Sequence, residues 1–254
     1  MFARYLRRGV AAGVAAGIAY AAYMVFVGNP LSEYVHEAGS EAGHDHGHAH
    51  AHEAGGHAHE AGTVVSETTV AAVSAGSGLL WAILLGGVFA VALYFLEPAV
   101  PGPSAAKPYL LAAAGFLTVS GVPWLVLPPA APGAEHAYGI DARLGIYVGL
   151  VALGAITVAA AAAAYERGRS HGVGAGLAAG ALPFAVVVAL SLAAPTVTTH
   201  PGLPTDLVSA YRALAVLSQA ALWLLVAAAF DALGRRGTAP TTEPTGPSDD
   251  ALVG

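Results

Sequence analysis

Long apolar stretches alternate with short polar connections along most of the chain. Six of these stretches carry no charged residue and reach the roughly twenty residues that a helix needs to cross about 30 Å of hydrocarbon. They lie at about 9–27, 78–96, 109–127, 144–164, 172–194 and 213–230. Backbone polar groups in lipid must bond within their own segment, so each stretch is expected to be a helix. The predicted fold class is all-α: a polytopic membrane protein, built as a bundle of about six transmembrane helices.

Composition supports this prediction and narrows the partners. Of the 254 residues only 10% are charged and 56% are hydrophobic, with a mean hydropathy of +0.63. Soluble domains carry about a quarter charged residues, so the expected surroundings are the lipid bilayer. A net charge of -6 with scattered basic residues argues against nucleic acid as a partner. Without cysteine the chain has no disulfide framework, thiolate zinc site or thiol catalysis.

The distribution of Lys and Arg predicts the orientation of the spans. A six-span layout places eight of the ten on one side and only Arg143 and Arg212 on the other. The side richer in Lys and Arg is normally cytoplasmic, so a multi-pass protein of the cell membrane with both termini in the cytoplasm is expected. One alternative stays open for the first span, which follows Arg7 and Arg8 and could be a cleaved signal peptide.

The layout divides the chain into four parts. Residues 1–27 form the cytoplasmic N-terminus and first span, and 28–77 an extracytoplasmic His-rich loop expected to be disordered. Residues 78–234 form a five-helix transmembrane region, and 235–254 a cytoplasmic tail expected to be disordered from its Thr, Pro, Ser and Gly content. Gly9, Gly13 and Gly17 recur every fourth residue in the first span, which suits close helix packing or reflects a chain with 32 glycines.

The external loop holds the most distinctive chemistry of the chain. Eight of the eleven histidines of the whole chain lie between residues 36 and 59, many of them at alternate positions, with carboxylates between them. Neutral imidazole is a ligand for zinc, copper, nickel and cobalt, and Gly and Ala spacers let several nitrogens converge on one ion. The loop is therefore expected to bind divalent transition metals and to lose them as pH falls through about 6. A solvated low-complexity linker without a metal role is the alternative.

Polar groups at the outer helix ends extend this prediction. Glu33, His36 and Glu37 would share one face of a short helix. Glu135, His136 and Asp141 follow the third span, and His200 and Asp206 follow the fifth, so the three groups could form one outer site fed by the loop. The candidate metal ligands are Glu33, His36, Glu37, His44, Asp45, His46, His48, His50, His52, His57, His59, His136 and His200.

The span interiors offer weaker candidates. None of the six cores contains Asp, Glu or His, although such residues usually mark an ion site at the midplane. Pro123 and Pro183 each free a backbone carbonyl, which could face a pathway or simply accompany a kink. No nucleophile, base and orienting group occur together, so an enzyme is not expected.

The order of these features resembles the CbtA family, the probable cobalt transporter subunits. The resemblance runs over most of the chain, through the following segments: Arg7-Arg8-Gly9, Asn29 to Glu37, the His-rich loop, Gly121-Val122-Pro123-Trp124, Arg143 with Tyr147, and Leu203 to Leu207 with Tyr211-Arg212. A shorter His-bearing loop is usual in that family. The resemblance implies Co²⁺ uptake, often beside a small His-bearing membrane subunit of the CbtB kind. The residues themselves leave Ni²⁺ or Zn²⁺ open, because a flexible nitrogen site follows the Irving–Williams order.

The resulting hypothesis is an integral membrane transporter subunit for divalent metal uptake, with cobalt first and an external metal-collecting loop. A different hypothesis is a membrane-anchored accessory protein that buffers metal for a separate permease, which the lack of ionisable midplane residues favours. A metal exporter ranks third, because efflux would collect ions on the cytoplasmic side. The oligomeric state is left open.

Overall fold

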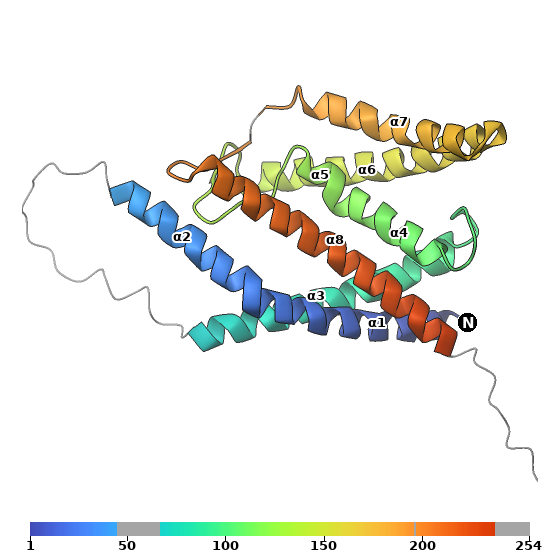
Figure 1. Cartoon of the computed structure of the whole chain (residues 1–254), viewed down its shortest axis with the longest axis horizontal. Helices are drawn as coiled ribbons and strands as arrows, with labels where there is room; N and C mark the ends of the chain where they lie inside the picture. The colour runs from blue at the N-terminus through green and yellow to red at the C-terminus, as the bar shows by residue number, and fades with distance from the viewer. Residues whose placement is uncertain (45–66, 196, 237–254) are drawn as a thin grey trace, which may run out of the picture.

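The computed structural model describes residues 1–44, 67–195 and 197–236. Within them the chain is almost entirely helical (Figure 1). The elements in chain order are α1 (Phe2–Tyr23), the π-helical turn η1 (Met24–Gly28), α2 (Asn29–His44), α3 (Glu67–Leu96), α4 (Lys107–Phe116), the π-helical turn η2 (Leu117–Gly121), α5 (Val122–Trp124), β1 (Glu135–His136), α6 (Ile140–Gly168), the 3₁₀ turn η3 (Arg169–His171), α7 (Val173–Ser191), β2 (Thr198–Thr199) and α8 (Thr205–Arg236).

Among the described residues five helices are long and apolar enough to cross a membrane, which confirms the all-α polytopic fold class. They are Phe2–Ser40, Thr69–Leu96, Ile140–His171, Val173–Ser191 and Thr205–Arg236. The predicted third span is helical over Lys107–Trp124, ends sooner than expected and includes Thr118, Ser120 and Pro123. This segment packs against α8 on one side and α6 on the other, and Ser120 is only 3% exposed. Contact with protein instead of lipid explains how a less apolar segment is accommodated.

The first helix does not end near residue 27. It continues without a break through η1 into α2, and α3 already begins at Glu67. The expected loop over 28–77 is therefore helical at both of its ends. Its remainder, residues 45–66, and the expected tail beyond Arg236 lie outside the described residues.

The core lies where α1, α3, α4 and α8 meet. Its buried members are Ala12, Ala16, Ala82, Leu85, Phe89, Ala90, Leu93, Leu111, Ala112, Leu222, Trp223, Val226, Ala227 and Phe230. α7 packs on α6, and this pair lies to one side of the core in Figure 1. Only 6% of the most apolar window of α7 is buried by protein, against 33% in α3. The α6–α7 pair therefore presents most of its surface to lipid.

Small residues explain the close contact of α1 with α3. A Cβ built on Gly13 would lie 2.5 Å from the carbonyl oxygen of Ala82, and one on Gly86 would lie 2.8 Å from the Cα of Gly13. Gly9 and Gly17 likewise face Ala90 and Leu79 too closely for a side chain. Gly9, Gly13 and Gly17, which recur every fourth residue, thus have a packing role, because the absence of side chains lets the two backbones touch.

Pro123 shows how a freed carbonyl is satisfied inside the bundle. Proline has no N–H to offer the carbonyl four residues earlier, which belongs to Val119. The Tyr147 hydroxyl on α6 donates to that oxygen at 3.1 Å. Nearby, Gly154 lies against the backbone of Thr118, which brings α6 close enough for this bond. The carbonyl at Val119 is therefore bonded to protein instead of being open to a path.

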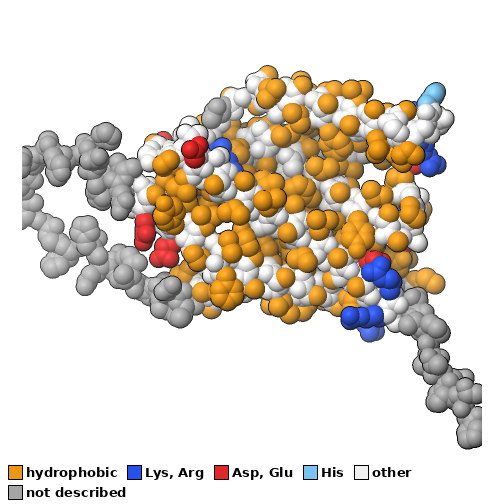
Figure 2. Space-filling view, viewed as in Figure 1, with side chains coloured by type: hydrophobic (Ala, Val, Ile, Leu, Met, Phe, Trp, Pro, Cys, Tyr) orange, Lys and Arg blue, Asp and Glu red, His pale blue; other side chains and the backbone are white. Residues whose placement is uncertain are grey.

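The two ends of the bundle differ in charge. The N-terminus and the end of α8 lie together at one end, where most of the Lys and Arg side chains of this view also gather (Figures 1 and 2). We call this the basic end, defined by Arg4, Arg7, Arg8, Lys107, Arg167, Arg169, Arg235 and Arg236. α2, the two short strands and the start of α8 lie at the opposite end (Figure 1).

Cross-helix bonds fasten the basic end. The Tyr5 hydroxyl donates to Glu97 Oε2 at 2.8 Å, and Lys107 Nζ donates to the Glu97 carbonyl at 2.7 Å. The Arg8 guanidinium lies 3.8 Å from the ring centre of Phe230 and donates to the Phe230 carbonyl. Asp231, 8% exposed, pairs with Arg235 at 2.6 Å. The Asp231–Arg235 pair lies within α8, whereas the bonds of Tyr5, Arg8 and Lys107 join α1, the end of α3, α4 and α8. Sequence patterns gave no sign of the Arg8 bond, whose members are 222 residues apart.

Candidate metal-handling surface

α2 carries the first predicted group of ligands. Glu33, His36 and Glu37 are all exposed on this helix, whereas Val35 between them is completely buried. One side of α2 therefore packs on the protein while the Glu33, His36 and Glu37 side faces away. The spacing of three and four residues puts the three side chains on neighbouring turns of one face, as predicted. We call these three residues the α2 ladder.

The α2 ladder leads toward the His-rich segment. Ser40 Oγ donates to the carbonyls of His36 and Glu37, at 3.1 and 2.8 Å. The helix ends at His44, and the other loop candidates lie outside the described residues: Asp45, His46, His48, His50, His52, His57 and His59. Their role as metal ligands stays a prediction.

A small two-stranded pairing positions the other two predicted histidines. β1 and β2 are antiparallel, with Glu135 opposite Thr199 and His136 opposite Thr198. The Thr198 hydroxyl lies 3.4 Å from His136 Nδ1. His200 follows β2 directly, and its Nε2 accepts a hydrogen bond from the Ala131 N–H at 3.1 Å. An Nε2 that accepts has no proton of its own, so this bond requires the neutral imidazole of His200.

The surroundings of His200 favour the same neutral form. Burial lowers the pKa of His200 below its usual value, and the nearby positive charge of Arg212 and the His136 ring lower it further. Because Arg212 also repels a metal ion, His200 is a weaker cation ligand here than the sequence alone indicates. His136 is exposed, and the described contacts engage only its Nδ1 side.

We expect acid to weaken the fold through His200. Its imidazole titrates near 6.5 in the unfolded chain and lower in the folded chain, so between these values the unfolded chain binds more protons. The free energy of unfolding should therefore fall as pH drops below about 6.5. Thermal unfolding of the detergent-solubilised protein at pH 7.5 and 5.5 measures this.

His200→Gln should reduce that pH dependence, because its amide oxygen can accept from Ala131 at either pH. His171→Gln serves as the control, since His171 is exposed at the basic end. Equal pH dependence in the two variants would contradict the role given to His200.

The predicted outer groups do not converge in the structure. Among the described residues, no three His, Asp or Glu side chains come together in a way that could hold a metal ion. Asp141 and Asp206 instead lie in the first turns of α6 and α8, where a carboxylate stabilises the positive end of the helix dipole. The α2 ladder and the His136–His200 pair are thus separate candidates at one end of the bundle.

Two polar groups at this end escaped the sequence reasoning. The Nδ2 of Asn29, at the start of α2, and the Nε of Arg212, near the start of α8, are buried without a hydrogen-bond partner in the described part of the chain. Both belong to segments that carried the family resemblance. Within the spans, by contrast, polar side chains bond mostly to their own helix, as Thr157 does to the Leu153 carbonyl at 2.7 Å.

Comparison with known proteins bears on the whole described bundle. A search of curated proteins and a search of solved structures gave no match. A family model described as "Probable cobalt transporter subunit (CbtA)" matches residues 2–235, which include all the described helices and both strands except the last residue of α8. Since this match covers far more than half of the chain and agrees with the polytopic helical fold, the chain belongs to the CbtA family of probable cobalt transporter subunits.

Proposed function

We propose that this multi-pass membrane protein takes up divalent cobalt, with the His-rich segment collecting the ion outside the cell and the α2 ladder passing it on to the bundle. Membership of a cobalt transporter subunit family already makes a metal ion the expected cargo. The direction of transport, the orientation and the ligands are parts of this proposal. Ni²⁺ and Zn²⁺ are alternative cargoes, because imidazole and carboxylate ligands accept all three.

The unbroken helix from α1 to α2 is the observation that carries the proposal. The helix from Phe2 to Ser40 has 39 residues, which at 1.5 Å each is roughly twice the thickness of the hydrocarbon core. Its first part packs in the bundle, so its second part extends beyond the apolar region with the α2 ladder exposed. A continuous helical segment thus connects the start of the His-rich segment to the bundle, with two carboxylates and an imidazole along the way.

The charge difference between the ends supports the orientation. Eight of the ten Lys and Arg lie at the basic end, the arrangement expected of a cytoplasmic face. The α2 ladder, His136 and His200 lie at the other end, where metal would arrive. With both termini in the cytoplasm, the loop histidines face outward, as uptake requires and export does not.

The accessory role is the second candidate, and a specific observation favours it. No three metal-binding side chains converge in the described bundle, and the predicted span cores hold no Asp, Glu or His. A chain that only concentrates metal outside the membrane would need neither a converging ligand site in the bundle nor ionisable residues within its spans. In that case a separate permease, or a small His-bearing partner subunit of the CbtB kind, would provide the path across the membrane.

Metal uptake into cells that express this chain alone tests both candidates. We expect saturable uptake of radioactive cobalt above that of empty cells. Changing the seven histidines from His44 to His59 to Asn keeps the loop length, and should raise the half-saturation concentration several-fold without lowering the maximal rate. The reason is that the loop is expected to raise the local cobalt concentration without being part of the path through the membrane. No uptake, from a chain shown to be folded in the membrane and to bind cobalt, would contradict the permease and support the accessory role.

A further inference from the structure

The turn between α6 and α7 has chemistry that metal uptake does not use. It lies at the basic end and joins the two helices least covered by protein, with 17% and 6% of their most apolar windows buried. The turn therefore belongs to the pair of spanning helices that protein covers least. A binding site there would be reached from the membrane interface.

A pocket of about 500 Å³ opens at this turn. Tyr165, Glu166, Arg169, Ser170 and Val173 line it. Its wall combines an aromatic ring and an aliphatic side chain, which suit the glycerol and upper acyl region of a lipid, with the guanidinium of Arg169, which suits a phosphate. Tyrosine is enriched at this depth in membrane proteins because its ring and hydroxyl prefer different sides of the interface.

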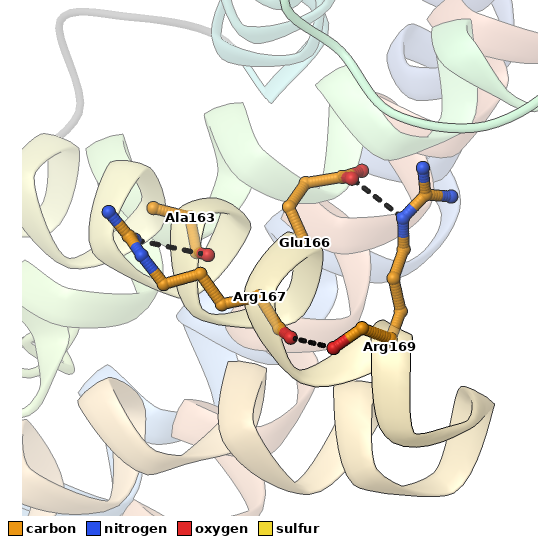
Figure 3. Close-up of polar contacts among 5 residues, drawn as sticks. Ala163, Glu166, Arg167 and Arg169 are labelled. Atoms are coloured by element: carbon orange, nitrogen blue, oxygen red, sulfur yellow. Dashed lines mark hydrogen bonds and ion pairs between the residues drawn. The ribbon is translucent and has the colours of Figure 1, made fainter.

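The charges of the turn leave donors for an anion. Arg169 Nε pairs with Glu166 Oε2 at 2.7 Å, and the two terminal nitrogens of Arg169 point away from that carboxylate (Figure 3). Arg167, in the last turn of α6, points away from this pair and donates to the Ala163 carbonyl at 3.3 Å, while its own carbonyl accepts from the Ser170 hydroxyl at 2.8 Å (Figure 3). The single carboxylate offsets one of the two guanidiniums, so the turn keeps a net positive charge.

We infer that this pocket binds the phosphate of an anionic phospholipid headgroup, with the two terminal nitrogens of Arg169 as its direct donors. Arg169 is half exposed and already oriented by Glu166, so little side-chain freedom remains to be lost when a phosphate arrives. The bidentate fork of a guanidinium matches phosphate oxygens well. The inference is independent of the direction of metal transport.

Native mass spectrometry of the full chain, released from detergent with phosphatidylglycerol or phosphatidylcholine, tests the site. We expect the wild-type chain to retain phosphatidylglycerol preferentially. Arg169→Gln should weaken this retention about five-fold, the effect of one cationic contact at a membrane surface. Arg7→Gln, which removes an exposed arginine elsewhere at the basic end, should leave it unchanged.

Glu166→Gln separates an anion site from a merely structural ion pair. Removal of the carboxylate frees Arg169, so retention should stay equal or rise. A loss equal to that of Arg169→Gln would overturn the inference, as would equal retention of the two lipids by the wild-type chain. Displacement by millimolar inorganic phosphate would assign the pocket to free phosphate and overturn the lipid as its ligand.

Discussion

Gly86→Leu should prevent the bundle from assembling, whereas Gly87→Leu one residue later should leave it intact. A Cβ at Gly86 would lie 2.8 Å from the Cα of Gly13, inside the contact between α1 and α3. The leucine would force the two backbones apart, and this separation would disrupt the packing of the buried Ala82 and Phe89. Overpacking costs about 1–3 kcal/mol even where side chains can yield, and here the obstacle is backbone, so a larger loss of stability is expected.

The matched control makes this result specific. A Cβ at Gly87 would meet nothing within 4 Å, so its leucine points into open space on the same helix. Both variants gain the same apolar side chain, and hence the same tendency to insert into a membrane. Yield of monodisperse protein from gel filtration and the thermal midpoint in detergent measure the difference. Similar behaviour of the two variants would contradict the α1–α3 contact described above.

Removal of the α2 ladder should strongly reduce cobalt uptake while leaving the fold unchanged. The combined variant Glu33→Gln, His36→Asn and Glu37→Gln keeps the side-chain sizes and removes both carboxylates and the imidazole. Even partners that merely orient a metal ligand are worth 10- to 100-fold in affinity, so the loss of three ligands should lower uptake at least ten-fold. Because all three side chains are exposed, the thermal midpoint should not move.

The neighbouring Tyr34→Ala variant is the control for this experiment. Tyr34 is 61% exposed and lies within the same stretch of α2, so its loss changes the helix surface without removing a metal ligand. Its uptake should stay close to that of the wild-type chain. Normal uptake by the triple variant would place the ion path elsewhere, and His136 would then be the next residue to change.

Apolar pattern alone predicted most of the fold, because a membrane leaves the backbone few choices. Five spans and the helical nature of the sixth segment followed from stretches without charge. The pattern failed at the end of the first span, since polarity at Ser32, Glu33 and Glu37 indicates the end of the hydrocarbon but not the end of a helix. A helix in water needs no apolar sequence if one side of it, here Val35, packs on the protein.

The candidate site was less predictable for a physical reason. Residue type and spacing identified the α2 ladder, because its members are neighbours on one helix. Whether side chains of separate loops come close depends on tertiary packing. Sequence spacing therefore could not test whether Asp141 and Asp206 lie near the α2 ladder. The position of Arg212 beside His200, and the Tyr147 hydroxyl on the Val119 carbonyl, likewise depend on how helices cross.

The place of α8 at the centre of the core has a consequence for biogenesis. α1 and α4 pack on α8, the last helix among the described residues, and its Leu222, Val226 and Phe230 are almost fully buried there. While the ribosome is still translating the α6–α7 hairpin, α1 and α3 can already pair, but the surface of α4 that faces α8 has not yet met its partner. The nascent protein must therefore shelter that surface until residue 236 has left the ribosome, and a chain truncated before α8 should be a substrate for membrane proteolysis.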